Sequence, residues 1–225
     1  DDTLALADPG GGRTLGTALA DGPLPGTDAL RLATGLAGTL AGLHRRGLLH
    51  RDITPANVLL APDGTPTLID FGLATAQVEG PDAGRLIGTL AYVAPEQTGR
   101  TGRGVDQRAD LYGLGATLYA ALTGRAPFGG DDPLRLVHDI LVAVPEEPAV
   151  LNEDVPIIVS AIVMRLLEKE PDHRYQSAEG LAHDLERVAR RRLTDITLGE
   201  RDFPARLVAP PCPVGRTTER AALRT

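Results

Sequence analysis

Three side chains with oxygen donors lie close together in the sequence, on either side of a short predicted hairpin. Asp52 and Asn57 come before the hairpin, and Asp70 follows it. Because the two ends of a hairpin meet in space, we expect these side chains to converge. Carboxylate and amide oxygens are ligands that suit Mg²⁺. A carboxylate beside a magnesium-bound polyphosphate is the arrangement that phosphoryl transfer requires, so the pattern points to that chemistry.

The elements that position these residues follow from the spacing of apolar side chains. Leucine and alanine recur at helical spacing over residues 28–46, which predicts a long helix with Thr27 as its N-cap and Gly47 at its end. Short strands are predicted over residues 57–60 and 67–69, joined by a turn at residues 62–64.

The rest of the chain is predicted to be mostly helical. Residues 73–104 are rich in glycine and irregular, which indicates a long loop. Further helices are expected over residues 106–123, 133–142, 155–168 and 177–192, with Ser177 capping the last, and a short strand over 3–7. The expected fold class is therefore α+β, mainly α-helical, with short β-hairpins.

Composition excludes several classes of protein. The chain has 225 residues and a formal net charge of −7, which argues against a broad nucleic-acid or anionic-lipid surface. No apolar run approaches the ~20 residues of a membrane-spanning helix. The single cysteine, Cys212, suits a reducing compartment, so we expect a cytoplasmic protein with no nucleic-acid or membrane partner within this chain. Lys169 is the only lysine.

Three motifs resemble the eukaryotic-like bacterial serine/threonine protein kinases. His50-Arg51-Asp52 is followed at the family spacing by Asn57, then by Asp70-Phe71-Gly72 and Ala94-Pro95-Glu96. The resemblance covers about residues 3–192 and implies the helical large lobe of a kinase, with ATP and Mg²⁺ as cofactors and a protein Ser or Thr as acceptor.

The resemblance also implies roles for single residues. Asp52 would be the catalytic base, Asn57 and Asp70 the magnesium ligands, and Leu59 would lie under the adenine, beside a hinge at residues 7–10. Residues 88–92 would position the substrate. Asp110 would hold the catalytic-loop backbone, and Arg174 would pair with Glu96.

The chain departs from the family in two ways. Thr54 stands where these kinases usually carry a lysine that meets the γ-phosphate, so we include Thr54 among the catalytic positions. The glycine-rich loop, the strand lysine and its glutamate, which belong to the small lobe, are not found. We therefore expect the isolated chain to be inactive.

The expected domain organisation is a truncated kinase domain over residues 1–193, consisting of the hinge strand and the large lobe. A proline-rich linker over residues 194–225 would follow. Val214-Gly215-Arg216 resembles the opening of AAA-type ATPase modules, so this segment is alternatively the start of such a module within a larger signalling protein.

Other interpretations stay open at this point. Asp52, Asn57 and Asp70 are residue types that also form turns. A pseudokinase-like binding module would share the fold, although such modules usually lose one of these three residues. A small-molecule phosphotransferase of the aminoglycoside or choline kinase type would share all three, but it lacks the Ala-Pro-Glu element and the substrate-positioning segment before it.

Overall fold

The computed structural model describes residues 12–70, 89–190 and 197–203. The expected strand over residues 3–7, the hinge at residues 7–10, Phe71 and Gly72, the first half of the expected loop (residues 73–88) and residues 204–225 lie outside these ranges.

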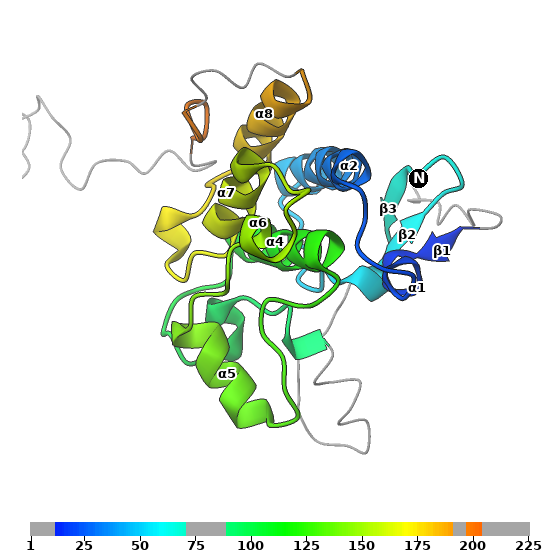
Figure 1. Cartoon of the computed structure of the whole chain (residues 1–225). Helices are drawn as coiled ribbons and strands as arrows, with labels where there is room; N and C mark the ends of the chain where they lie inside the picture. Colours follow the sequence, from blue (N-terminus) through cyan, green and yellow to red (C-terminus); the bar gives the residue numbers. More distant parts are fainter. Residues whose placement is uncertain (1–11, 71–88, 191–196, 204–225) are drawn as a thin grey trace, which may run out of the picture.

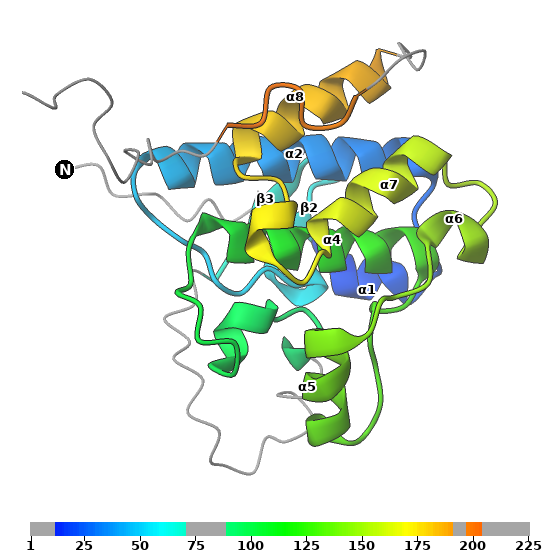
Figure 2. The same cartoon turned by 90° about the vertical axis from the view of Figure 1, so that its left-hand side faces the viewer.

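Helices form the body of the molecule (Figure 1). Helix α4 (Gln107–Thr123) lies in the middle, where it contacts α2 (Gly26–Arg45), α6 (Pro148–Leu151) and α7 (Ile157–Leu166). Helix α8 (Ala178–Ala189) packs on the other face of α2, so that α8, α2 and α4 form successive layers (Figure 2). Every residue of α4 from Ala109 to Leu122 is buried, which identifies this helix as the centre of the core.

A three-stranded antiparallel sheet lies at one side of the helices. Its order is β1 (Arg13–Thr14), β2 (Val58–Leu60) and β3 (Pro66–Leu68). Leu59 pairs with Thr14 on one side and with Thr67 on the other. Helix α1 (Leu15–Leu19) follows β1 directly, and Thr14 caps it by accepting a hydrogen bond from the Thr17 N–H at 3.1 Å.

Helix α5 (Pro133–Val142) lies apart from α2 and α8 in both views (Figures 1 and 2). Its buried residues Leu136 and Ile140 pack with Phe128 in a second, smaller core. Three short 3₁₀ helices complete the described part: η1 (Pro55–Asn57), η2 (Pro95–Thr98) and η3 (Pro171–His173). None of the helices in the described ranges is long and apolar enough to cross a membrane.

Most of the expected elements are confirmed. Helix α5 has the predicted bounds, α4 begins one residue later because Asp106 is its N-cap, and Ser177 caps α8. The fold class is α+β and mainly helical. The expected N-cap at Thr27 is wrong, because α2 already begins at Gly26 after Pro25 and has no side-chain cap. The sequence analysis missed β1, α1 and α6, each of which has five residues or fewer.

Residues 197–203 return to the helical body. Asp202 accepts hydrogen bonds from the backbone N–H groups of Gln176 at 2.8 Å and Ser177 at 2.9 Å, next to the start of α8. The N–H of Gly199 donates to the buried Asp184 at 2.6 Å. These contacts hold the segment against α8, after the expected end of the domain at residue 193.

Gly115 allows α4 and α7 to approach closely. A Cβ at this position would lie 2.6 Å from the Cβ of Leu166, whereas a Cβ at Gly38 on α2 would meet nothing within 4 Å. We expect Gly115→Ala to lower the free energy of unfolding by ~1–3 kcal/mol through overpacking. We expect Gly38→Ala to raise it by ~0.5–1 kcal/mol, because alanine restricts the unfolded chain. Urea unfolding of the two variants tests both signs, and a stabilised Gly115→Ala would refute the close approach.

Lys169, which follows α7 in the chain, binds the end of helix α5. Its Nζ donates to the carbonyl of Ile140 at 2.7 Å near the end of α5, and it lies 4.2 Å from the centre of the Phe128 ring. Burial, together with the nearby Arg174 guanidinium, lowers the pKa of Lys169 from 10.5 to about 8, although the Asp139 and Glu168 carboxylates oppose the change.

This lowered pKa predicts a pH dependence of stability. Between about pH 8 and 10.5 the unfolded state binds more protons at Lys169 than the folded state, so the free energy of unfolding rises with pH. We expect a rise of ~1 kcal/mol, because solvent screens this partly exposed group. Lys169→Met should lack the rise, which guanidinium unfolding at pH 7.5, 9 and 10 measures. Parallel curves for the two proteins would contradict this prediction.

Candidate active site

The loop that carries Asp52 is anchored on helix α4 by a buried carboxylate. Asp110 accepts hydrogen bonds from the backbone N–H groups of His50 at 2.9 Å and Arg51 at 2.7 Å. His44 Nε2 lies 2.8 Å from the same carboxylate, and since a carboxylate only accepts, His44 is the donor. The structure thus confirms that Asp110 holds the catalytic-loop backbone, as expected from the sequence. His50 is fully buried, with Nε2 3.3 Å from the Ile69 carbonyl.

Two further residues of α4 hold the same loop, and the sequence analysis missed this role for both. The Thr117 hydroxyl donates to the Ile53 carbonyl at 3.1 Å. A Cβ at Gly113 would lie 3.2 Å from the Cβ of Ile53, so a glycine lets the loop lie directly on the helix. Asp110, Gly113 and Thr117 share one helical face, because they are three and four residues apart. A polar Thr117 seven residues after Asp110 on an apolar helix is the signal that pointed to this face.

The structure brings Asp52 and Asn57 together. The Asn57 amide nitrogen donates to the Asp52 carboxylate at 2.7 Å and to the Asp52 carbonyl at 2.9 Å. The 3₁₀ turn η1 makes this contact possible, because the Asn57 N–H donates back to the Thr54 carbonyl at 3.0 Å. Asn57 therefore fixes both the backbone and the side chain of Asp52.

The sheet places Asp70 next to Asn57. Val58 pairs with Leu68, and beyond this pair the Ile69 N–H donates to the Asn57 carbonyl at 3.0 Å. Asp70 follows immediately, is exposed and has a left-handed backbone with a φ of 53°. The hairpin thus brings the start of β2 and the end of β3 together, and Asn57 and Asp70 stand at this open end, away from the turn.

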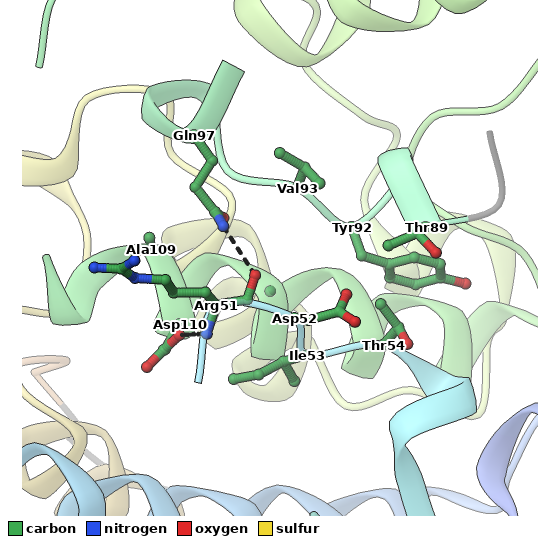
Figure 3. A pocket seen from close by; sticks show the side chains of 11 residues that line it. Arg51, Asp52, Ile53, Thr54, Thr89, Tyr92, Val93, Gln97, Ala109 and Asp110 are labelled. Atoms are coloured by element: carbon green, nitrogen blue, oxygen red, sulfur yellow. Dashed lines mark hydrogen bonds between the residues drawn. The ribbon is translucent and has the colours of Figure 1, made fainter. Parts of the chain in front are cut away.

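Asp52 and Thr54 line a small pocket (Figure 3). Thr89 and Tyr92 approach from the segment expected to position the substrate, residues 88–92, and Val93 and Gln97, which follow it in the chain, also line the pocket. Burial raises the pKa of Tyr92, so its phenol stays protonated near neutral pH. Leu59, Asn57 and Asp70 do not line this pocket; Leu59 lies half-buried in the middle of the sheet.

The donors present fit a magnesium–nucleotide complex. Asn57 uses its amide nitrogen for Asp52, and among the described residues its amide oxygen accepts no hydrogen bond. Within the described ranges no cluster of three or more His, Cys, Asp or Glu side chains could hold a metal alone. Mg²⁺ typically binds one or two protein oxygens together with substrate phosphates, so a site with Asn57 and the adjacent Asp70 suits it.

Glu96 and Arg174 form a buried ion pair that the sequence analysis expected. Two parallel hydrogen bonds of 2.7 and 2.9 Å join the guanidinium to the carboxylate. The remaining guanidinium donors reach the carbonyls of Arg108, Glu168 and Lys169, and the group lies 4.9 Å from the centre of the Tyr112 ring. The pair connects η2, which borders the pocket, to the segment before α8.

Comparisons with known proteins agree with this geometry. Residues 9–185 match the model of the protein kinase domain. A probable serine/threonine-protein kinase of Streptomyces coelicolor is 39% identical over 161 residues, which are 70% of this chain and 24% of that protein. The serine/threonine-protein kinase PksC of the same organism is 38% identical over 187 residues, 79% of this chain and 33% of that protein.

A mycobacterial relative gives a similar result. The serine/threonine-protein kinase PknB of Mycobacterium leprae is 35% identical over 171 residues, 75% of this chain and 27% of that protein. The chain therefore belongs to the protein kinase domain family, and its relatives are eukaryotic-like bacterial serine/threonine kinases. It spans about a quarter to a third of the length of these relatives.

Removal of one partner of the buried pair leaves an uncompensated charge. We expect Glu96→Gln to lower the free energy of unfolding by ~3–5 kcal/mol, because Arg174 stays buried and charged. The exposed pair Arg13–Asp21 serves as the control, and Asp21→Asn should change stability by less than ~1 kcal/mol. Denaturant unfolding measures both variants, and equal effects would show that the buried pair does not stabilise the fold.

Proposed function

We propose that the full-length protein transfers the γ-phosphoryl group of Mg-ATP to a serine or threonine hydroxyl of a protein substrate. The observation that carries this proposal is the Asp52 carboxylate. It is fixed by Asn57 and lines a pocket shared with Thr89 and Tyr92. Membership of the protein kinase domain family supports the same reaction.

In this proposal Asp52 is the catalytic base. Its carboxylate accepts the proton of the acceptor hydroxyl and orients that hydroxyl for attack. Asn57 keeps the carboxylate in one direction, and Asp110 holds the backbone that precedes it. Thr54 departs from the family pattern, because it lines the pocket with a neutral hydroxyl where these kinases usually carry a lysine. It therefore stabilises the charge on the transferred phosphoryl group less than a lysine would.

Asn57 and Asp70 are the proposed magnesium ligands, and Leu59 is the proposed contact for the adenine. When bound, Mg²⁺ neutralises charge on the phosphate oxygens. The Asn57 amide oxygen accepts no hydrogen bond from the part of the chain that the structure describes, and this, with the adjacent position of Asp70, supports the assignment. Leu59 lies on the strand that leads from Asn57 away from the pocket, which agrees with a nucleotide that extends along the sheet.

A protein acceptor is favoured by the segment beside Asp52. Tyr92 and Val93 close a turn in which their N–H groups donate to the carbonyls of Thr89 and Leu90 at 3.1 Å. This turn borders the pocket and leads into Ala94-Pro95-Glu96, which the buried Arg174 fixes in place. Such a rigid wall next to the base suits an extended peptide.

We also propose that this chain alone is inactive. Its only lysine, Lys169, donates to the carbonyl of Ile140 on α5 and does not line the pocket. Phosphoryl transfer in this family needs a lysine at the α- and β-phosphates, so that residue has to come from outside this chain. We propose that the kinase domain over residues 1–193 also includes residues 197–203, which pack against α8. We propose a linker after these residues, and a cytoplasmic location.

A phosphate-transfer assay tests the proposed function. In the full-length protein we expect Asp52→Asn to lower kcat with a generic basic protein substrate by ~10²–10⁴-fold, because the base is lost. Asp131→Asn, a change of the same kind at an exposed position, should leave kcat unchanged. The 225-residue chain alone should transfer no phosphate. Full activity of Asp52→Asn would overturn the assignment of the base.

A further inference from the structure

The side-chain amide of Gln97 joins two segments of the site. Its Oε1 accepts a hydrogen bond from the Ala94 N–H at 3.0 Å, at the end of the segment that borders the pocket. Its Nε2 donates to the Arg51 carbonyl at 2.9 Å, on the loop that carries Asp52 (Figure 3). One planar amide thus connects two distant segments, since Gln97 and Arg51 are 46 positions apart in the sequence.

The carbonyl that Gln97 binds belongs to an unusual residue. Arg51 has a φ of 67°, in the left-handed region that residues other than glycine seldom adopt. Such a conformation persists only where neighbouring groups hold it. Asp110 binds the Arg51 N–H at 2.7 Å, and Gln97 binds the Arg51 carbonyl. Both backbone polar groups of the strained residue are therefore held, each by a different element.

This arrangement has a direct consequence for the next residue. The Arg51 carbonyl belongs to the peptide plane that leads into Asp52, so its direction sets where the Asp52 side chain starts. Asn57 holds Asp52 from the following side, through its carbonyl and its carboxylate. Gln97 holds the peptide that precedes Asp52, through the Arg51 carbonyl. Through the Ala94 N–H it also links that peptide to the segment that borders the pocket.

We propose that Gln97 is a positioning residue for phosphoryl transfer, which fixes the direction of Asp52 relative to the segment that holds the acceptor. The inference rests on the proposed function. Glutamine is suited to this role because a single group offers both an acceptor for Ala94 and a donor for Arg51. A glutamate at this position would keep the acceptor for the Ala94 N–H and lose the donor to the Arg51 carbonyl. A methionine, which has a similar side-chain length, would lose both hydrogen bonds.

The kinetic test compares Gln97→Glu and Gln97→Met in the full-length protein. Both variants should lower kcat for transfer to a protein substrate by ~10–100-fold and leave KM for ATP within ~2-fold, because the nucleotide contacts are unchanged. The pH profile of kcat should keep its shape in Gln97→Met, since only the position of Asp52 changes. If Gln97→Glu keeps the wild-type kcat, the bond to Arg51 does not matter for transfer and Gln97 serves only to cap η2 through the Ala94 N–H. This result would overturn the proposal.

Gln107 provides a matched control on helix α4. Its Nε2 donates to the Gln176 carbonyl at 2.8 Å, a similar bond between distant segments that does not reach the pocket. Gln107→Glu and Gln107→Met should leave kcat unchanged. If kcat falls equally in the Gln107 variants, the effect comes from a general loss of stability and not from the position of Asp52. This result would overturn the proposal.

Hydrogen exchange separates this inference from the proposed function. In the full-length protein, peptides that contain Arg51 and Asp52 should exchange at least ~5-fold faster in both Gln97 variants, whereas the Ala94 amide should lose protection only in Gln97→Met. Unchanged exchange at Arg51 and Asp52 overturns the positioning role. A wild-type protein without transfer activity overturns the proposed function, and the exchange data then still decide whether Gln97 fixes the loop.

Discussion

The arrangement of the site depends on one buried carboxylate at the start of helix α4. Asp110 is only 1% exposed and accepts three hydrogen bonds, two from the backbone of the catalytic loop and one from His44. A buried carboxylate is tolerated only when such donors surround it. Because two of the donors are backbone N–H groups of the loop, the carboxylate selects one conformation of the loop, including the left-handed Arg51.

Helix α4 can act as this anchor because it is rigidly enclosed. It contacts α2, α6 and α7, and a glycine on one face lets α7 approach closely while another lets the catalytic loop approach. The Glu96–Arg174 pair fixes the opposite wall of the pocket to the same body. The loop that carries Asp52 and the segment across the pocket are thereby held by elements that are buried and tightly packed, as precise positioning requires.

The sequence allowed the long helices to be predicted, because apolar periodicity and clear end signals agree there. Asp106 and Gly124 bound α4, and Asp132 and Pro133 begin α5. The start of α2 was mispredicted, because Thr27 is a good capping residue but the helix already begins after Pro25. Helix α1 is too short to show a period.

The site was predictable where motifs carry the information. The motif containing Asp52 and Asn57 predicted that these two side chains meet, and Asp110 and Arg174 were placed correctly as supports. The contact of Gln97 was not predictable, because it joins segments 46 residues apart through packing that no local pattern encodes. The contact of Thr117, which joins segments 64 residues apart, was indicated only by a polar residue on an apolar helix. The chemical roles of all five site residues stay predictions, because they concern a bound nucleotide and its acceptor: Asp52, Thr54, Asn57, Leu59 and Asp70.

The lone lysine also makes the molecule accessible to selective chemistry. An amine-specific label can attach to only one side chain of this chain, Lys169, and that amine is engaged with the carbonyl of Ile140 and the face of Phe128. Because these contacts hold the partly exposed amine, labelling of Lys169 becomes faster when α5 separates from the loop that follows α7. The labelling rate at this single position becomes a reporter of the motion of α5, with no engineered probe needed.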